Sequence, residues 1–242
     1  MAATEDAVLA PSGAAQRHGA SPCAELYIRS VKAYYEARAP EYDDWYLGLG
    51  RFDGLERLHW DDELHALERT LAALPALRTL DVACGTGFLM QHLGGDVTGL
   101  DQSALMLEVA RARMPAAKLV QADALPLPFP DASFDRVFTA HFYGHLEEPE
   151  RASFLAEARR VAPELVVVDA AVRPDRDRVG TQERVLNDGT RWEVYKRYFD
   201  PDELAAELGG GETLFAGCWF VAVRTARSWR ADGGARPEGI GL

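Results

Sequence analysis

An acid and two glycines stand where an apolar stretch of the chain gives way to a turn. The segment reads DVACGTG over residues 81–87. Glycine reaches backbone angles barred to other residues and lets a ligand approach the main chain. The first N–H groups of a following helix also lack partners within that helix. The segment therefore predicts a turn that holds a ligand with backbone amides, although Gly-x-Gly alone does not say which ligand.

Two further acids end the next apolar stretches. Asp101 closes the run 97–101, and Asp123 closes the run 118–123. Carboxylates at these places can accept hydrogen bonds from hydroxyl or amino groups of a ligand. Ligands of parallel sheets bind at the carboxyl ends of the strands, so we expect both acids near the glycine turn.

Three residues after the fourth apolar run, 134–140, are candidates for catalysis: His141, Tyr143 and His145. Histidine titrates near neutral pH and commonly acts as a general base. Alternatively, His141 lines a pocket only through its backbone, and His145 only opens the next helix. Two histidines could bind a metal, but no third ligand is evident, so we predict no metal site.

The apolar runs alternate with helical stretches from residue 77 onward. Strands are predicted over 77–83, 97–101, 118–123, 134–140, 165–172, 212–217 and 218–226, with helices over 88–93, 104–113, 146–161 and from 201. Ser103 and Asp200 stand where each could cap a helix by accepting a hydrogen bond from a free N–H. This order predicts an α/β fold with a doubly wound, mostly parallel sheet joined by right-handed crossovers. We divide the chain into a flexible tail (1–22), a helical cap (23–75), a core (76–227) and a second tail (228–242).

Composition narrows the function classes. The chain has 242 residues and a formal net charge of −12, which disfavours a large nucleic-acid footprint because phosphates are held by clustered Lys and Arg. No apolar run approaches the roughly 20 residues needed to span a bilayer. Its three cysteines are few and widely spaced, and no signal peptide is recognisable, so we expect a cytoplasmic protein.

Four motifs in this order resemble those of class I S-adenosylmethionine-dependent methyltransferases. The first is LDVACGTGFL over 80–89, in which Ala83 replaces a glycine of the family pattern (D/E)xGxGxG. The acids Asp101 and Asp123 match the second and third, and LPLPFPDASFDRVF over 125–138 resembles the segment before the fourth strand of small-molecule methyltransferases. The resemblance covers about residues 30–225 and implies a Rossmann-like, seven-stranded core with an N-terminal helical cap.

The resemblance also implies the cofactor contacts. Asp101 would bind the ribose hydroxyls, Asp123 the adenine amino group, and Arg38 the methionine carboxylate. The full set of predicted cofactor-binding residues is Tyr35, Arg38, Tyr42, Asp81, Ala83, Cys84, Gly85, Gly87, Asp101, Gln102, Met106, Asp123, Ala124 and His141. Four aromatic residues after the fifth strand could shape a substrate pocket or only pack in the core: Trp192, Tyr195, Tyr198 and Phe199.

The implied reaction is transfer of a methyl group from S-adenosylmethionine to a small-molecule acceptor, with S-adenosylhomocysteine as product. Three alternatives stay open: methylation of protein or RNA, cofactor binding without catalysis, and an NAD(P)-dependent oxidoreductase. The last would need GxGxxG, but Met90 occupies the third glycine position. The acceptor, the atom methylated and the oligomeric state are left open.

Overall fold

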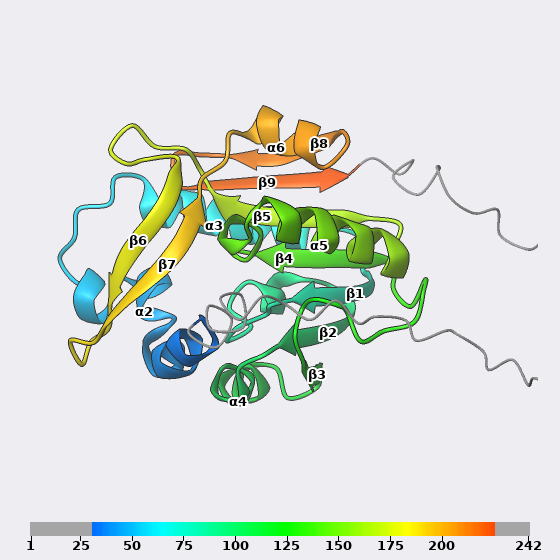
Figure 1. The fold of residues 1–242 in the computed structure, drawn as a ribbon, viewed down its shortest axis with the longest axis horizontal. Coiled ribbons are helices and arrows are strands. Elements are labelled where there is room, and N and C mark those ends of the chain that lie inside the picture. The colour runs from blue at the N-terminus through cyan, green and yellow to red at the C-terminus, as the bar shows by residue number, and fades with distance from the viewer. Residues whose placement is uncertain (1–30, 226–242) are drawn as a thin grey trace, which may run out of the picture.

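A seven-stranded sheet runs through the part of the chain that the computed structural model describes, residues 31–225 (Figure 1). Its strands, in spatial order, are β3 (Lys118–Gln121), β2 (Gly95–Asp101), β1 (Leu77–Val82), β4 (Arg136–Ala140), β5 (Leu165–Ala170), β9 (Phe220–Thr225) and β8 (Gly211–Ala216). The first five pair in parallel, whereas β9 is antiparallel to both of its neighbours. The predicted doubly wound, mostly parallel, seven-stranded sheet is confirmed.

Helices cover both faces of this sheet. The helices α5 (Glu148–Val161) and α6 (Pro201–Glu207) pack into one hydrophobic cluster, and α3 (Trp60–Ala72) and α4 (Ala104–Arg113) into the cluster on the opposite face. The side chains of β5 alternate between the two faces of the sheet. Val167 packs in the first cluster, and Val166 and Val168 pack in the second. A strand covered on both faces is largely apolar, and every residue of β5 is buried, including its one acid, Asp169.

The predicted helix starts are confirmed at two places. The Ser103 hydroxyl accepts a hydrogen bond from the Met106 amide at 3.1 Å, and α4 begins at the next residue. The Asp200 carboxylate accepts from the Asp202 and Glu203 amides at 2.9 and 3.3 Å, at the start of α6. Each side chain supplies a partner to amides that the helix itself leaves unpaired.

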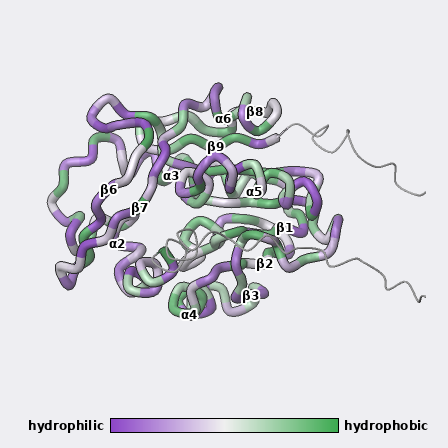
Figure 2. The backbone as a smooth tube through the Cα atoms, in the orientation of Figure 1, coloured by the Kyte–Doolittle hydropathy of each residue, from purple (hydrophilic) through white to green (hydrophobic). Residues whose placement is uncertain are grey.

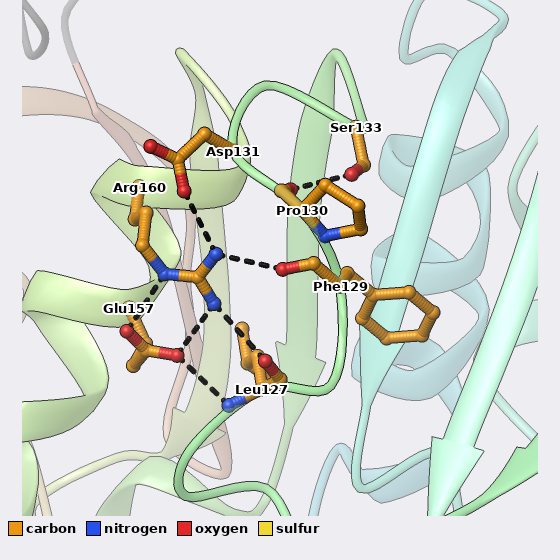
Figure 3. A network of polar contacts seen from close by, with 7 residues as sticks. All are labelled: Leu127, Phe129, Pro130, Asp131, Ser133, Glu157 and Arg160. Atoms are coloured by element: carbon orange, nitrogen blue, oxygen red, sulfur yellow. Dashed lines mark hydrogen bonds and ion pairs between the residues drawn. The ribbon is translucent and has the colours of Figure 1, made fainter.

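The loop before β4 is held by one side chain of α5 (Figure 3). The Arg160 guanidinium donates to the carbonyl oxygens of Leu127 and Phe129 at 3.0 and 2.7 Å and to the Asp131 carboxylate at 3.0 Å. Glu157 both accepts from Arg160 at 2.7 Å and accepts from the Leu127 amide at 2.9 Å. A proline-rich loop that cannot pair as a strand is thereby fixed against the sheet.

A two-stranded antiparallel sheet, β6 (Val179–Val185) and β7 (Arg191–Arg197), was not predicted. It follows β5 and extends away from the main sheet (Figure 1). Its residues are mostly hydrophilic, in contrast to the central strands (Figure 2). A strand signal that depends on apolar residues is therefore weak here, although β7 alternates exposed and less exposed positions over most of its length.

Three other predictions need correction or lie outside the description. The helix predicted over 88–93 is only a 3-10 turn, η3 (Met90–His92). The predicted cap over 23–75 is split, because α3 packs on the face of the sheet. Only the segment before it, namely the helical residues 31–38 with η1 (Ala39–Glu41), α2 (Asp44–Leu47) and η2 (Gly50–Phe52), is left for a cap. Both predicted tails, 1–22 and 228–242, lie outside the described residues.

Within residues 31–225, no helix combines the length and apolar character required to cross a bilayer.

Gly99, in the middle of β2, is required by close packing. A Cβ atom there would lie 2.8 Å from Cys84 Sγ, 2.9 Å from Leu119 Cδ2 and 3.0 Å from Met90 Sδ. We therefore expect Gly99→Ala to lower the free energy of unfolding by about 1–3 kcal/mol, as overpacking does. Urea denaturation measures this change.

The matched control is Gly94→Ala, just before the same strand, where the nearest atom to an added Cβ, Ala76 Cβ, lies at an ordinary 3.4 Å. This control should change the free energy of unfolding by no more than about 0.5 kcal/mol. Equal effects of the two substitutions would contradict the packing explanation.

Candidate functional site

A cavity opens at the carboxyl ends of β1, β2 and β4. About 1100 Å³ within and above it is free of protein atoms, part of it open to solvent. Most of the residues predicted to bind or act on a ligand line this cavity: Tyr35, Tyr42, Ala83, Gly85, Asp101, Gln102, Met106, Asp123, Ala124, His141 and His145. The expectation that the strand ends bring these residues together is therefore met, and the strand ends are where sheets of this kind bind small ligands.

The glycine turn after β1 adopts a left-handed conformation at every second residue. Ala83, Gly85 and Gly87 have φ values of +60°, +54° and +73°. Such angles are strained for alanine, and strained backbone persists where the surroundings fix it, often at ligand sites. The turn is fixed by the Cys84 amide, which donates to the Leu100 carbonyl of β2 at 2.9 Å.

Three of the predicted residues in this segment do not line the cavity itself. Gly87 faces α4, where an added Cβ would lie 3.5 Å from Ala110 Cβ. Asp81 and Cys84 line a smaller, adjoining space behind the turn. Burial raises the pKa of the Cys84 thiol well above its usual value, which disfavours the reactive thiolate form. Burial, with the nearby Asp101, also raises the pKa of Asp81, whose Oδ1 has no hydrogen-bond partner.

The Asp101 carboxylate is held rigidly at the cavity wall. Its Oδ2 accepts a hydrogen bond from the Gly85 amide at 2.9 Å, and its Oδ1 accepts from the Ser103 amide at 2.8 Å. Burial raises its pKa, and the hydrogen bonds from Ser103 and Gly85 act in the opposite direction. Each carboxylate oxygen has a second lone pair, so Asp101 can also accept hydrogen bonds from a ligand. Asp123, by contrast, is exposed on the rim.

The segment 31–52 lies against the turn and α4. Glu36 accepts hydrogen bonds from the Ala104 and Leu105 amides, the first two of α4, at 2.9 and 3.3 Å. Asp43 accepts from the Thr86 hydroxyl at 2.6 Å and forms an ion pair with Arg113. A negative charge at a helix start is favourable, so these contacts hold the segment beside the cavity.

Arg38 lies behind the cavity lining. It donates to the Tyr34 hydroxyl, and its guanidinium carbon lies 5.1 Å from the ring centroid of Tyr42, which does line the cavity. Among residues 31–225, no carboxylate pairs with Arg38. An uncompensated guanidinium in this position is suited to bind a carboxylate.

His141 follows β4 with φ of +56°. Its ring meets the edge of Trp45 at a centroid distance of 5.0 Å, and its Nδ1 lies 3.9 Å from Asp169 Oδ1. Its Nε2 is buried without a hydrogen-bond partner. Burial lowers the pKa of His141 to about 4, so the ring is neutral at physiological pH.

His145, in η4 (Tyr143–His145), has a defined tautomer. Its Nδ1 lies 2.7 Å from the Tyr195 carbonyl oxygen. Because a carbonyl can only accept, Nδ1 carries the proton and Nε2 keeps a free lone pair. Burial lowers the pKa of His145 well below its usual value. A neutral imidazole that lines the cavity and has an unprotonated nitrogen is equipped to act as a general base.

Tyr143 is not at the site, contrary to prediction. Its side chain is fully buried, and its hydroxyl donates to Glu207 Oε1 at 2.8 Å. The ring packs beside Phe154 and Phe199 in the cluster under α5. A 3-10 turn places residues two apart in sequence on different sides, so His145 faces the cavity while Tyr143 faces the core.

The four aromatic residues after β5 do not line the cavity either. Trp192 packs near Tyr34, Tyr198 accepts from Gln182, and Phe199 lies in the core. Tyr195 contributes only its carbonyl oxygen, to His145.

A buried ion pair near the histidines was missed. Lys196 Nζ of β7 lies 2.5 Å from Asp169 Oδ1 at the end of β5, and Asp169 Oδ2 accepts from the Gly144 amide at 2.7 Å. Both side chains are almost fully buried. The single acid in the apolar run of β5 was a usable signal for Asp169, whereas nothing marked Lys196 as its partner.

Among the described residues, no three His, Cys, Asp or Glu side chains gather closely enough to hold a metal ion.

Known proteins resemble this chain in sequence and in fold. Residues 80–164 match a family described as a methyltransferase domain. A demethylmenaquinone methyltransferase of Renibacterium salmoninarum is 37% identical over 136 residues, 54% of this chain and 53% of that protein. A 2-methyl-6-phytyl-1,4-hydroquinone methyltransferase of Synechocystis is 30% identical over 190 residues, 63% of this chain and 58% of that protein. The chain thus spans between half and two thirds of the length of these relatives.

Solved structures extend the likeness to most of the chain. A complex of DhpI with SAH has a TM-score of 0.65 and 27% identity, covering 81% of this chain and 95% of that one. A methyltransferase of Burkholderia thailandensis in complex with 1,6-didemethyltoxoflavin and S-adenosylhomocysteine has a TM-score of 0.54 and shares the fold, at 15% identity over 90% of this chain and 92% of that one. The chain therefore has the fold of class I S-adenosylmethionine-dependent methyltransferases, and its residues 80–164 match a methyltransferase domain. The two curated relatives described above are quinone methyltransferases.

His141 makes a specific prediction for stability. Since its folded pKa is about 4 and its unfolded value about 6.5, the unfolded chain binds a proton between these pH values that the folded chain does not. The stability that His141 contributes is therefore complete above pH 6.5 and falls as the pH falls towards 4, by up to about 3 kcal/mol. Urea denaturation from pH 4.5 to 7.5 should show a shallower loss for His141→Asn than for the wild type.

The control is His65→Asn, because His65 is exposed on α3. It should keep the wild-type slope against pH. The same slope for His141→Asn would show that His141 titrates normally in the folded protein.

Proposed function

We propose that this chain transfers the methyl group of S-adenosylmethionine to a small-molecule acceptor and releases S-adenosylhomocysteine. The observation that carries the proposal is that the Gly85 turn, Asp101 and Asp123 meet in one cavity at the carboxyl ends of the strands. Named methyltransferases among the relatives and structural neighbours support it.

The residues present fit this cofactor. We assign Asp101 to the ribose hydroxyls, because its oxygens retain lone pairs, and Asp123 to the adenine amino group. The Gly85 turn and Arg38 are assigned to the methionyl part, since the Arg38 guanidinium pairs with no carboxylate of the described residues. Tyr35, Tyr42, Gln102, Met106 and Ala124 would form the remaining walls.

The cofactor supplies a methyl group already activated by a positively charged sulfur. The acceptor forms its bond to the methyl carbon as the sulfur–carbon bond breaks, and the electron pair of that bond stays on sulfur. The protein must align the three atoms, and positioning of this kind lowers a barrier by up to about 7–11 kcal/mol. Where the acceptor atom carries a proton, we assign its removal to Nε2 of His145.

A small acceptor is favoured by the cavity and by the acidic character of the chain. The formal net charge is −12, which disfavours RNA, and the relatives named above act on quinone-type molecules. We assign residues 31–52 to covering the bound ligands, because Glu36 and Asp43 hold this segment beside the turn. A cytoplasmic location remains part of the proposal.

The first prediction concerns cofactor binding. Asp101→Ala should weaken S-adenosylmethionine and S-adenosylhomocysteine binding by about 10²- to 10⁴-fold, because two hydrogen bonds to a charged acceptor are lost, each about 1.5–3 kcal/mol. Isothermal titration calorimetry measures the two dissociation constants.

Asp96→Asn is the matched control, since Asp96 is exposed near the opposite end of β2. It should bind both ligands as the wild type does. If the folded wild type binds neither ligand, the proposed function is wrong.

The second prediction concerns His145. With an acceptor found by screening for S-adenosylhomocysteine release, His145→Gln should lower kcat by about 10²–10⁴ and leave cofactor affinity unchanged, since a general base contributes a factor of this size. Because the pKa of His145 is lowered, kcat should be flat from pH 6 to 8 with no inflection near 6.5.

Tyr143→Phe tests the corrected position of Tyr143, whose hydroxyl contacts Glu207. It should keep kcat within about twofold of the wild type, as expected of a side chain outside the cavity. A full loss in Tyr143→Phe with normal activity of His145→Gln would reverse the assignment.

A further inference from the structure

Arg184 lies on the inward face of the β6–β7 sheet. It pairs with Trp192 across the strands, and residues two positions apart along a strand share a face. On the same face, Leu186, Val194 and Lys196 are all buried. Arg184 itself is half-buried, so its guanidinium is directed towards the body of the protein and is only partly hydrated.

No residue between 31 and 225 forms a hydrogen bond or ion pair with Arg184. The other cations of β6 and β7 are all paired. Arg191 lies 2.5 Å from Glu183, Lys196 lies 2.5 Å from Asp169, and Arg197 lies 2.8 Å from Glu207. The chain has a net charge of −12, so carboxylates are plentiful, yet among residues 31–225 none pairs with Arg184. An unpaired charge that has lost part of its hydration is stabilised when an anion binds it.

The charge of Arg184 acts on two residues that line the cavity, Tyr35 and His145. Burial raises the pKa of Tyr35, and Arg38 and Arg184 oppose that rise. Burial also lowers the pKa of His145, and Lys196 and Arg184 lower it further. The rings of Tyr35 and His145 lie 6.3 Å apart, edge to face, in the cavity wall. Tyr35 also packs against an apolar cluster that includes Leu186 and Val194, which lie on the same face of the β6–β7 sheet as Arg184. Arg184 is not among the residues that line the cavity, but it lies close to the part of the wall formed by Tyr35 and His145.

The cavity lining combines apolar side chains with three acids, Asp101, Asp123 and Glu150. Val31, Phe142 and Leu146 line the cavity together with Tyr35 and His145. A ligand held here would place a hydrophobic body against these side chains and a polar group towards the guanidinium. Guanidinium groups bind carboxylate and phosphoryl oxygens through two parallel hydrogen bonds.

We propose that the acceptor bears an oxyanion, either a carboxylate or a phosphoryl group, on an apolar body, and that Arg184 binds this oxyanion beside His145. This inference rests on the proposed function, because it describes the second molecule in the same cavity. Arg184 would fix the acceptor at one end, so that the atom to be methylated lies between His145 and the cofactor. The neighbouring Lys196 cannot take this role, because Asp169 already neutralises it.

The test compares matched probes by calorimetry on protein saturated with S-adenosylhomocysteine. The probes are phenylacetate, phenylphosphonate and the neutral phenylacetamide. The wild type should bind one of the anions at least about tenfold more tightly than the amide, as a hydrogen-bonded charge pair provides. The more tightly bound anion then identifies the oxyanion as carboxylate or phosphoryl.

Three variants locate the anion. Arg184→Gln should remove the preference for the anion, Arg184→Lys should retain part of it, and Arg191→Gln, which removes an exposed arginine of the same sheet, should retain all of it. Thermal unfolding of each variant confirms that it is folded. No preference in the wild type, or an unchanged preference in Arg184→Gln, would overturn the proposal.

The titration with S-adenosylhomocysteine separates this inference from the function on which it rests. If the wild type does not bind that ligand, the proposed function fails. The anions are then titrated against the unliganded protein. A preference that Arg184→Gln loses and Arg191→Gln keeps would still support an anion site, and its absence would overturn that site too.

Discussion

The carboxylate of Asp101 joins the ends of two neighbouring strands, and the site depends on this junction. Its oxygens accept hydrogen bonds from the Gly85 amide after β1 and the Ser103 amide after β2. Parallel pairing places both strand ends at one edge. Without a common acceptor, the glycine turn would leave a buried N–H unpaired, which costs about as much as a lost hydrogen bond. The same group thus shapes the turn and presents its remaining lone pairs to the cavity.

Two segments are attached to this edge by charged contacts as well as by apolar packing. The segment 31–52 is held by Asp43, which binds both Thr86 and Arg113. The β6–β7 sheet is held by Lys196, which pairs with Asp169 in the interior. A buried ion pair adds little net stability over a well-packed apolar pair, but removing one partner is strongly destabilising. Such a pair therefore fixes the position of the β6–β7 sheet, and with it the carbonyl of Tyr195 that orients His145.

The sequence was sufficient for the sheet and for most of the cavity lining, because the signals there are local. Apolar runs that end in Asp101 or in the Gly85 turn mark strand ends, and Ser103 marks a helix start. The failures are equally specific. Tyr143 and His145 are only two residues apart in the sequence, yet in a 3-10 turn the side chain of Tyr143 lies in the core and that of His145 lies at the cavity. The partner of Asp169 lies 27 residues further along the chain, a separation at which no sequence pattern fixes a contact.

The β6–β7 sheet was not predicted because its strands are rich in polar residues, and these same residues make its contacts near the cavity. Its residues are polar because one face is solvated and the other carries Gln182, Arg184 and Lys196 towards the protein. Strands are predicted from runs of apolar residues, so a polar strand pair gives only a weak signal in the sequence. Its role is evident only from the contacts that its side chains make in the structure. In the proposed function, the residues around Gly85 and Asp101 bind the cofactor, which is the same whatever the acceptor is. The β6–β7 sheet supplies Arg184, the cation proposed to bind the acceptor beside His145. Substitutions in this sheet would therefore change the acceptor without disturbing the junction at Asp101.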